Sequence, residues 1–187
     1  MASSIEEVLA KLVDDPSLAG QFRKTYGRDL DREILLDAIA CFERSLLTPG
    51  GRFDRWLEGD AGAITPEELS GYQLFKSLGC ISCHQGVNVG GNLFQRHGIF
   101  HPLGSPSPEL LRVPSLRNVA TTPPYFHDGS AKTLPEAVKA MGFAQLDRVL
   151  TEEQITAIVA FLNTLTGAYR GRPVTAAPEA QQRVTSP

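Results

Sequence analysis

The chain has 187 residues, which is long enough for one large domain or two small ones with a buried core. Its content of 42% hydrophobic and 21% charged residues is that of a globular protein and excludes a disordered or fibrous chain. The net charge of −3 and the pI near 5.8 exclude the basic surface that binds nucleic acid, and no apolar run has the length that a transmembrane helix needs.

Three helices are predicted at the start of the chain. The first begins at Ser4, where Glu7 completes the spacing of a capping box, and apolar residues then recur at helical intervals. The second begins at Asp15-Pro16 and stops near Gly27. A third, longer helix is capped by Asp31.

The third helix carries a well-defined apolar face and ends at Thr48-Pro-Gly-Gly51. The apolar positions of this face are Ile34 or Leu35, Ala38, Ile39, Phe42 and Leu46. Cys41 lies within the same pattern, and a lone cysteine on such a face is expected to be a buried small hydrophobe. One short helical turn follows, with Phe53, Trp56 and Leu57, so residues 1–60 are predicted to be a helical segment.

A second unit, residues 61–168, begins with a helix that leads into a cysteine pair. Thr65-Pro-Glu-Glu68 combines an N-cap, a proline at the first helical position and a capping glutamate, so it predicts a helix over 65–79. This helix delivers the chain directly into Cys80-Ile-Ser-Cys-His84. The stretch 85–124 that follows is rich in Gly, Pro, Ser and Asn, and so long an irregular segment is expected to wrap a ligand or to carry function.

Two further capping boxes predict the last helices. Thr133-Leu-Pro-Glu136 opens a short helix that stops at Gly142. Thr151-Glu-Glu-Gln154 opens the final helix, which we expect to cross the helix before the cysteine pair and to bury Leu74, Phe75, Ile158 and Leu162. The polar tail, 169–187, is predicted to be flexible. Because no strand of ordinary length is evident, the predicted class is all-α.

The sequence Cys-x-x-Cys-His is the attachment signature of c-type haem. Two thiols reach the two vinyl groups on one edge of the porphyrin, while the adjacent imidazole turns under the ring to hold the iron. The motif therefore predicts one covalent haem c, attached through Cys80 and Cys83, with His84 as the iron ligand.

The same cysteines fit two other kinds of site. His97 and His101 follow Cys83 at the spacing of a Cys2His2 zinc site. The glycine and proline residues around this histidine pair disfavour the helix that such a site uses, and zinc would leave His84 without a role. A thioredoxin-like redox pair needs a strand before the motif, where the sequence predicts a helix. Haem is the favoured ligand.

The sixth position of the iron decides between electron transfer and small-molecule chemistry. Outside the motif, the methionines and histidines of the chain are Met1, Met141, His97, His101 and His127. Met141 lies at the end of a capped helix, from which its thioether could reach the iron from the far face and favour electron transfer. The alternative is that Met141 fills a gap in the core. The histidines are by default loop or turn residues, and spacing alone leaves both readings of Met141 open.

Six separate segments resemble bacterial di-haem cytochrome c peroxidases, and they occur in the order found in that family. They are FERSLL (42–47), RFDRWL (52–57), GCISCHQGVN (79–88), VPSLRNV (113–119), PYFHDGS (124–130) and LPEAVKAM (134–141). The resemblance runs to about Gly167 and covers the C-terminal, high-potential haem domain with the helices before it. It implies a c-type cytochrome domain with extra N-terminal helices and a haem-wrapping loop.

The family's division of labour assigns roles to particular residues. In its members an N-terminal haem reduces hydrogen peroxide to water, and the C-terminal haem, ligated by His and Met, accepts electrons from a small donor protein. The resemblance implies that Cys80 and Cys83 are the thioether attachments, His84 the proximal ligand and Met141 the distal ligand. A calcium ion between the domains would take backbone carbonyls from Thr122 and Pro124.

The resemblance also implies partners and a location. The partners are a redox donor of the cytochrome c or cupredoxin type, an N-terminal peroxidatic haem domain joined through residues 1–60, and a second copy in a homodimer. The location is the periplasm, because c-type haem is attached outside the bacterial cytoplasm. The first residues lack the pattern of an export signal, which favours an excised fragment of a longer protein.

The sequence departs from the family in one respect that bears on activity. It has one Cys-x-x-Cys-His motif, so the peroxide-reducing haem lies outside these 187 residues, and we expect no catalytic residue among them. Trp56 does not match the tryptophan that lies between the two haems of relatives. Two hypotheses follow: the chain is the electron-accepting half of a peroxidase, without turnover of its own, or it is a stand-alone monohaem electron-transfer cytochrome.

Overall fold

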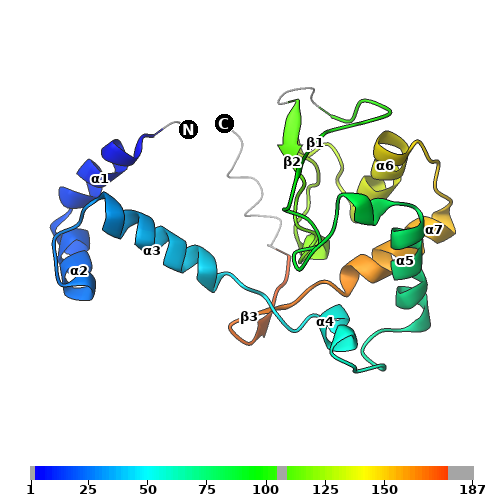
Figure 1. Ribbon diagram of the computed structural model, residues 1–187, viewed down its shortest axis with the longest axis horizontal. Helices are drawn as coiled ribbons and strands as arrows, with labels where there is room; N and C mark the ends of the chain where they lie inside the picture. The colour runs from blue at the N-terminus through cyan, green and yellow to red at the C-terminus, as the bar shows by residue number, and fades with distance from the viewer. Residues whose placement is uncertain (1–2, 105–108, 177–187) are drawn as a thin grey trace. The chain divides into compact units, whose positions relative to one another are not determined.

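The computed structural model describes residues 3–104 and 109–176 and divides into two compact units, Met1–Leu47 and Thr48–Pro187 (Figure 1). The described residues are mainly helical with short strands, which confirms the predicted all-α class. The division falls before the boundary predicted after residue 60. The reason is that the helix α4, Arg52–Leu57, packs in the second unit, where Phe53 is part of the core.

The first unit contains the helices α1 (Ile5–Val13), α2 (Pro16–Tyr26) and α3 (Arg32–Ser45). The predicted caps are all formed: the side chains of Ser4, Asp15 and Asp31 each accept a backbone N–H of the helix that follows. α1 contacts both other helices, and Ile34 and Leu35 of α3 are the buried residues of the described part of this unit.

Cys41 is exposed, which corrects the prediction that it is a buried hydrophobe. The buried positions of α3 lie in its first turns, beside α1 and α2, whereas Cys41 lies in the second half of the helix (Figure 1). Its thiol accepts a hydrogen bond from Arg44 Nη2 at 3.1 Å. Five large apolar residues along α3 and just after it are exposed as well: Leu36, Ile39, Phe42, Leu46 and Leu47.

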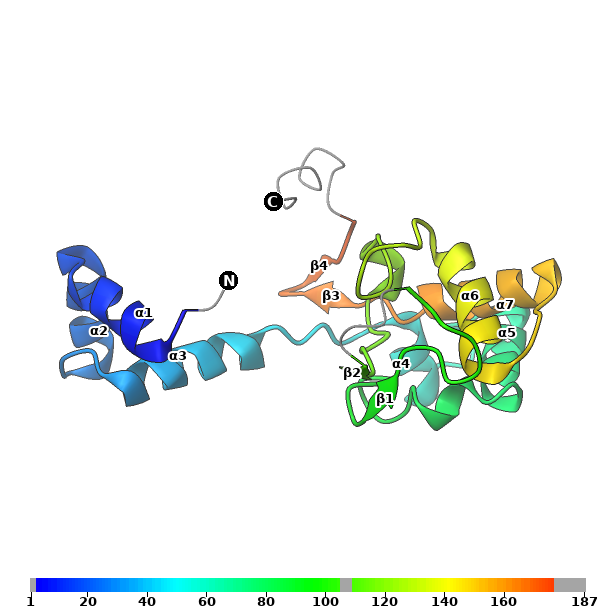
Figure 2. The same cartoon turned by 90° about the horizontal axis from the view of Figure 1, so that it is seen from above.

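The second unit contains α4, α5 (Pro66–Ser77), α6 (Leu134–Leu146) and α7 (Glu152–Asn163), with two 3₁₀ turns, η1 (Cys80–Ser82) and η2 (Val119–Thr121). The predicted capping boxes at Thr65, Thr133 and Thr151 are present. α5 crosses α7, and α6 packs on α7 (Figures 1 and 2). The residues expected to meet at the crossing do so: Phe75, Ile158 and Leu162 are buried in one cluster, and Leu74 packs against it.

The crossing of α5 and α7 is close because α5 has a glycine at the point of contact. A Cβ atom on Gly71 would lie 1.8 Å from the carbonyl oxygen of Ala157 and 3.0 Å from Cβ of Phe161. No side chain fits such a gap, so Gly71 lets the two backbones approach directly. Phe161, 1% exposed, fills the space beside it and contacts the rings of Phe53 and Phe75.

α6 is longer than predicted, since it continues past Gly142 to Leu146 and is capped by Asp147 in the left-handed conformation. Gly142 is therefore not a helix terminator. A Cβ on it would lie 2.7 Å from Cγ of Leu150, so the glycine makes room for the chain as it turns from α6 toward α7.

Short strands occur in two segments that the sequence left irregular. β1 (Phe94–Arg96) pairs with β2 (Leu110–Arg112) in antiparallel fashion inside the long loop 85–124. β3 (Ala168–Tyr169) and β4 (Arg172–Pro173) form a small hairpin at the start of the predicted flexible tail. The rest of that tail, 177–187, lies outside the described residues.

The first residues of the second unit are held by hydrogen bonds to its other end. Asn118 Nδ2 donates to Thr48 Oγ1 at 2.9 Å, and Asn118 Oδ1 accepts the Gly167 N–H at 3.0 Å. The Ala168 N–H donates to the Pro49 carbonyl at 3.1 Å. The segment that leads into α4 is therefore fixed to the segment that follows α7.

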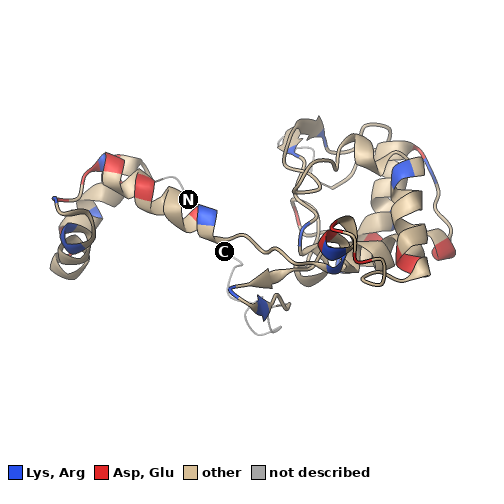
Figure 3. Cartoon of the chain, turned by 60° about the horizontal axis from the view of Figure 1, so that its bottom comes forward, with Lys and Arg blue, Asp and Glu red and all other residues tan. Residues whose placement is uncertain are grey.

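Charged residues of both signs occur on α3 and on the second unit (Figure 3). On the first unit they pair across the surface, as Arg28 does with Asp31 at 2.8 Å and with Glu33 at 2.7 Å. Within residues 3–104 and 109–176, no helix combines the length and the apolar character needed to cross a bilayer.

Candidate functional site

The cysteine pair and its histidine lie immediately after α5, as the sequence predicts. α5 ends at Ser77, Gly79 adopts the left-handed conformation that redirects the chain, and Cys80 begins the 3₁₀ turn η1. The His84 N–H donates to the Cys80 carbonyl at 3.0 Å, which closes the turn. Both thiols are free and half-buried, so the motif presents two unbridged sulfurs and one imidazole from a single turn of chain.

The His84 ring is half-buried, and its surroundings favour the neutral form. Burial lowers the pKa of His84 below its ordinary value, while the nearby backbone of Val89 and Pro114 acts in the opposite sense to a smaller extent. Its Nδ1 is buried and has no hydrogen-bond partner among the described residues. The ring lies 6.4 Å from the ring of Phe75, centre to centre. A neutral imidazole on a rigid support is the form that binds a metal ion.

The thiol of Cys80 is protonated near neutral pH. Burial raises its pKa to about 11, with a smaller contribution from Cys83 in the same direction. A redox-active cysteine pair requires the opposite shift, because the thiolate is the reactive form. The burial of the Cys80 thiol therefore argues against a thioredoxin-like pair.

The histidines of the zinc alternative lie against other partners. The His97 ring packs edge-on against Phe126 at 5.5 Å, and His101 stacks on Phe143 at 3.9 Å. Within the part of the chain that the structure describes, no three His, Cys, Asp or Glu side chains gather as a metal site. The spacing that resembled a Cys2His2 site does not bring its four side chains together.

The segment after the motif folds back on the segment 113–117. The Gly91 N–H donates to the Val113 carbonyl at 2.8 Å, and the Leu116 N–H donates to the Val89 carbonyl at 3.2 Å. Arg117 closes the arrangement by donating to the Val87 carbonyl at 2.8 Å and to Asp54 Oδ1 on α4 at 2.6 Å. The Arg117–Asp54 pair is mostly buried, at 18% side-chain exposure for each partner. This link to α4 has no signal in the sequence.

The long loop also exposes large apolar side chains, which are Val87, Phe94, Ile99, Phe100 and Leu110. Exposed apolar side chains are available to contact an apolar group. Together with the two free thiols and the His84 ring, they are compatible with the predicted haem-wrapping role of this loop.

The remaining candidate ligands come from other elements. Met141 lies in the second half of α6 and is half-buried. Thr122 follows η2 directly, is exposed, and donates through its hydroxyl to the Val119 carbonyl at 3.3 Å. Pro124 is also exposed. Ligation of iron by Met141 and of calcium by Thr122 and Pro124 stays a prediction.

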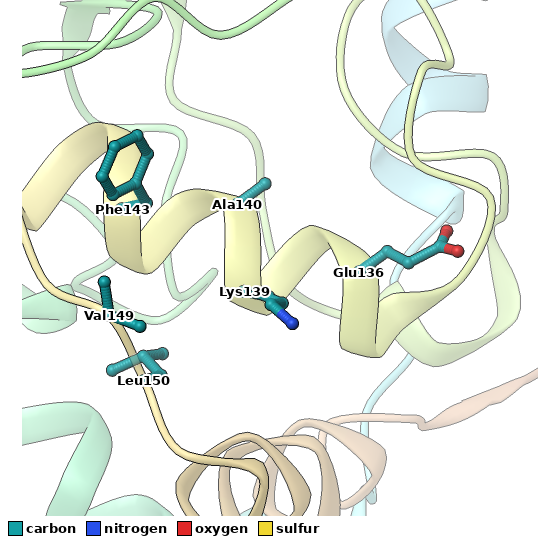
Figure 4. A pocket seen from close by; sticks show the side chains of 6 residues that line it. All are labelled: Glu136, Lys139, Ala140, Phe143, Val149 and Leu150. Atoms are coloured by element: carbon teal, nitrogen blue, oxygen red, sulfur yellow. The ribbon is translucent and has the colours of Figure 1, made fainter.

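The surface of α6 carries two shallow pockets of about 350 Å³ each. One lies between the helix and the chain leading to α7 and is lined by Glu136, Lys139, Ala140, Phe143, Val149 and Leu150 (Figure 4). The other lies toward Phe126 and Lys132 and shares Glu136 and Ala140 with the first. The cysteine–histidine motif lines neither pocket.

Two family models match the chain in separate parts. Residues 1–62 match the model described as di-haem cytochrome c peroxidase, and residues 69–166 match the model described as cytochrome c. The boundary between the matches lies within the second structural unit.

Curated proteins named as cytochrome c peroxidases are similar over most of the chain. Cytochrome c551 peroxidase of Nitrosomonas europaea is 43% identical over 184 residues, which is 88% of this chain and 54% of that protein. Cytochrome c peroxidase Ccp of Escherichia coli is 42% identical over 187 residues, which is 90% of this chain and 40% of that protein. The chain spans about half the length of the curated relatives it matches.

The fold is shared with a solved structure. A crystal structure of a MauG-like protein associated with microbial copper homeostasis superposes with a TM-score of 0.68, at 24% sequence identity. The match covers 89% of this chain and 63% of that chain.

Proposed function

Because this chain belongs to the di-haem cytochrome c peroxidase family, whose cytochrome c domain binds haem c covalently, we propose that it moves single electrons through one such haem. Its role is that of the high-potential half of a peroxidase, which accepts electrons for the reduction of hydrogen peroxide to water. The observation that carries the proposal is the placement, in one turn after α5, of two free thiols and an imidazole whose Nδ1 is buried without a hydrogen-bond partner.

Each site residue then has a stated task. Cys80 and Cys83 form the thioether links, and His84 is the proximal ligand of the iron, which supplies a one-electron couple when bound. Met141 on α6 is the distal ligand, and a thioether in that position favours the reduced state. Phe75 supports the His84 ring from α5, and the apolar side chains of the loop 85–124 keep water from the group.

The same proposal extends to the surroundings of the chain. Electrons come from a small protein of the cytochrome c or cupredoxin type and pass to an N-terminal peroxidatic haem domain joined through the helices of residues 1–60. The protein works in the periplasm as a homodimer. Calcium binds between the two haem domains, with the backbone carbonyls of Thr122 and Pro124 among its ligands.

Intact mass and an optical spectrum test the attachment. The chain, expressed with a c-type maturation system, is expected to gain the mass of one haem and to show Soret and sharp α and β bands. Replacing both Cys80 and Cys83 by serine should remove both thioethers, so that acid–organic extraction releases any bound haem, whereas Cys41→Ser on α3 should behave as the parent chain. A mature protein with the mass of the bare polypeptide contradicts the proposal.

A second candidate is a stand-alone monohaem electron-transfer cytochrome, with which the single Cys-x-x-Cys-His sequence of these 187 residues is equally compatible. The two candidates differ in what is encoded before residue 1. A second Cys-x-x-Cys-His sequence upstream in the same reading frame decides for the peroxidase half, and a start codon preceded by no such sequence decides for the carrier.

A further inference from the structure

Two segments far apart in the sequence meet at the C-terminal end of α6. The N–H groups of Phe100 and His101 both point at the Ala144 carbonyl, at 2.9 and 3.3 Å. The Gln145 side chain accepts the Ile99 N–H at 3.3 Å and donates to the Arg96 carbonyl at 3.0 Å. Four backbone groups of the loop 96–101 therefore attach it to the end of α6, more than forty positions later in the sequence.

His101 adds a side-chain contact on each of two sides. Its ring lies flat on the ring of Phe143, with 3.9 Å between the centres and 5° between the planes. Its Nε2 lies 2.7 Å from Oδ1 of Asp147, the residue that caps α6. One side chain therefore holds both the last turn of the helix and its cap.

The chain beyond α6 holds the same helix end from another direction. Leu150 packs against Gly142, and the Arg148 N–H donates to the Gly142 carbonyl at 3.0 Å. Figure 4 shows Phe143 at this end of α6, with Val149 and Leu150 on the chain that passes below it. The contacts of His101 and Leu150 thus fall within two turns after Met141.

We propose that His101 is a positioning residue for Met141: by fastening the end of α6 to the loop 96–101, it keeps the thioether at the iron. The inference rests on the proposed function, in which Met141 is the distal ligand. A neutral thioether is a weak ligand, so the fraction of molecules in which the helix end has moved away controls how readily another ligand replaces it.

His101 has little to contribute to global stability. Its side chain is 36% exposed and that of Asp147 is 61% exposed, and pairs of such exposure contribute little to unfolding free energy. Removing the contact should therefore change the local opening of the helix end far more than the unfolding of the whole domain. This difference separates a positioning role from a merely structural one.

Imidazole binding to the oxidised haem protein measures the opening. His101→Ala is expected to bind imidazole about tenfold more tightly than the parent chain, because the apparent affinity rises with the fraction of open molecules. His101→Phe retains a ring for Phe143 but loses Asp147, and should give an intermediate value. The matched control is Glu109→Gln, which breaks the exposed pair of Arg96 and Glu109, 2.9 Å apart, without touching α6. It should bind as the parent does, and all variants should keep the parent's thermal unfolding midpoint within a few degrees.

Three results would overturn the proposal. The first is an unchanged imidazole affinity in His101→Ala, and the second is an equal increase in Glu109→Gln. If His101→Ala fails to mature, His101→Phe and Asp147→Asn are tested in its place. The third result is then an imidazole affinity equal to that of the parent chain in both of these variants. Ligation of oxidised iron by a thioether gives a weak absorption band in the far red. If the parent chain lacks this band, Met141 is not the distal ligand, and the proposed ligand set fails rather than the role of His101.

Discussion

Glu68 is a charged residue within the core of the second unit, at 8% exposure. Its carboxylate binds both terminal nitrogens of Arg52 on α4 and accepts the Thr65 N–H at 2.8 Å, so it joins α4 to the start of α5. Burial raises the pKa of Glu68, but Arg52 and the Thr65 backbone outweigh burial and hold it below the ordinary 4.5. The ionised form is therefore the one that stabilises the fold.

The first prediction concerns this carboxylate. Glu68→Gln should lower the free energy of unfolding by about 1–3 kcal/mol at pH 7, because Arg52 loses its charged partner. A carboxylate whose pKa is lowered by folding contributes stability above its ordinary pKa, and this contribution is lost as the pH falls through the folded value. The difference between the parent and Glu68→Gln should therefore shrink when the pH is lowered from 7 to well below 4.5. Urea unfolding at the two pH values measures it.

The matched control is the exposed neighbour, Glu67→Gln, in the same first turn of α5. It should change the unfolding free energy by no more than about 0.5 kcal/mol at either pH. A loss in Glu67→Gln equal to that in Glu68→Gln would show that net charge, and not the buried pair, sets the pH dependence.

The second prediction concerns the distal ligand. Met141→Ala should abolish the far-red thioether–iron band of the oxidised protein and lower the reduction potential, because a thioether favours ferrous iron. Lys139→Ala, on an exposed position of the same helix, should leave both unchanged. A Met141→Ala protein with the parental spectrum would assign the sixth position to another residue.

At the scale of elements, the third prediction tests the crossing of α5 and α7. Gly71→Ala should reduce the unfolding free energy by about 3 kcal/mol or more, because the added methyl group meets the Ala157 carbonyl and the core cannot absorb it. Gly20→Ala in α2, where nothing lies within 4 Å, should instead stabilise by up to about 1 kcal/mol. Thermal unfolding of both variants decides, and equal behaviour would contradict the close crossing.

Helix starts were predictable because they depend on a few neighbouring residues. The capping boxes at Ser4, Thr65, Thr133 and Thr151 are all formed, since the cap and its glutamate or glutamine lie three positions apart. The predicted end of α6 was wrong because Gly142 does not terminate the helix. Its glycine is required by the close approach of Leu150, eight positions later. A structural feature can therefore be predicted from the local sequence when the residues that stabilise it are neighbours in the chain.

The candidate site divides in the same way. The motif at residues 80–84 is contiguous, so its position after α5 followed from the sequence. The contacts of Arg117 with Asp54 and of His101 with Asp147 join residues 63 and 46 positions apart, and no periodicity encodes them. The predicted burial of Cys41 was wrong because an apolar pattern predicts one face of a helix but does not show whether another element covers that face.

At the scale of the molecule, the fourth prediction follows from where the units divide. A chain beginning at Thr48 should take up haem with the parental spectrum, because the core cluster and the motif lie in the second unit. A chain beginning at residue 61 lacks Phe53 and should be less stable by about 3–5 kcal/mol, the usual loss for a buried phenylalanine. Denaturant unfolding compares the two, and equal stability would move the boundary back to residue 60.

The bonds that hold Thr48 and Pro49 to Asn118 and Ala168 have a consequence for digestion by proteases. A segment must unfold locally to enter the active-site groove of a protease. Thr48 and Pro49 resist this local unfolding because hydrogen bonds attach them to Asn118 and Ala168. Leu46 and Leu47 lie just before that fixed segment and are 48% and 71% exposed. An enzyme that cuts after leucine should therefore nick the chain there first and leave behind a coloured fragment whose new amino terminus is at residue 47 or 48.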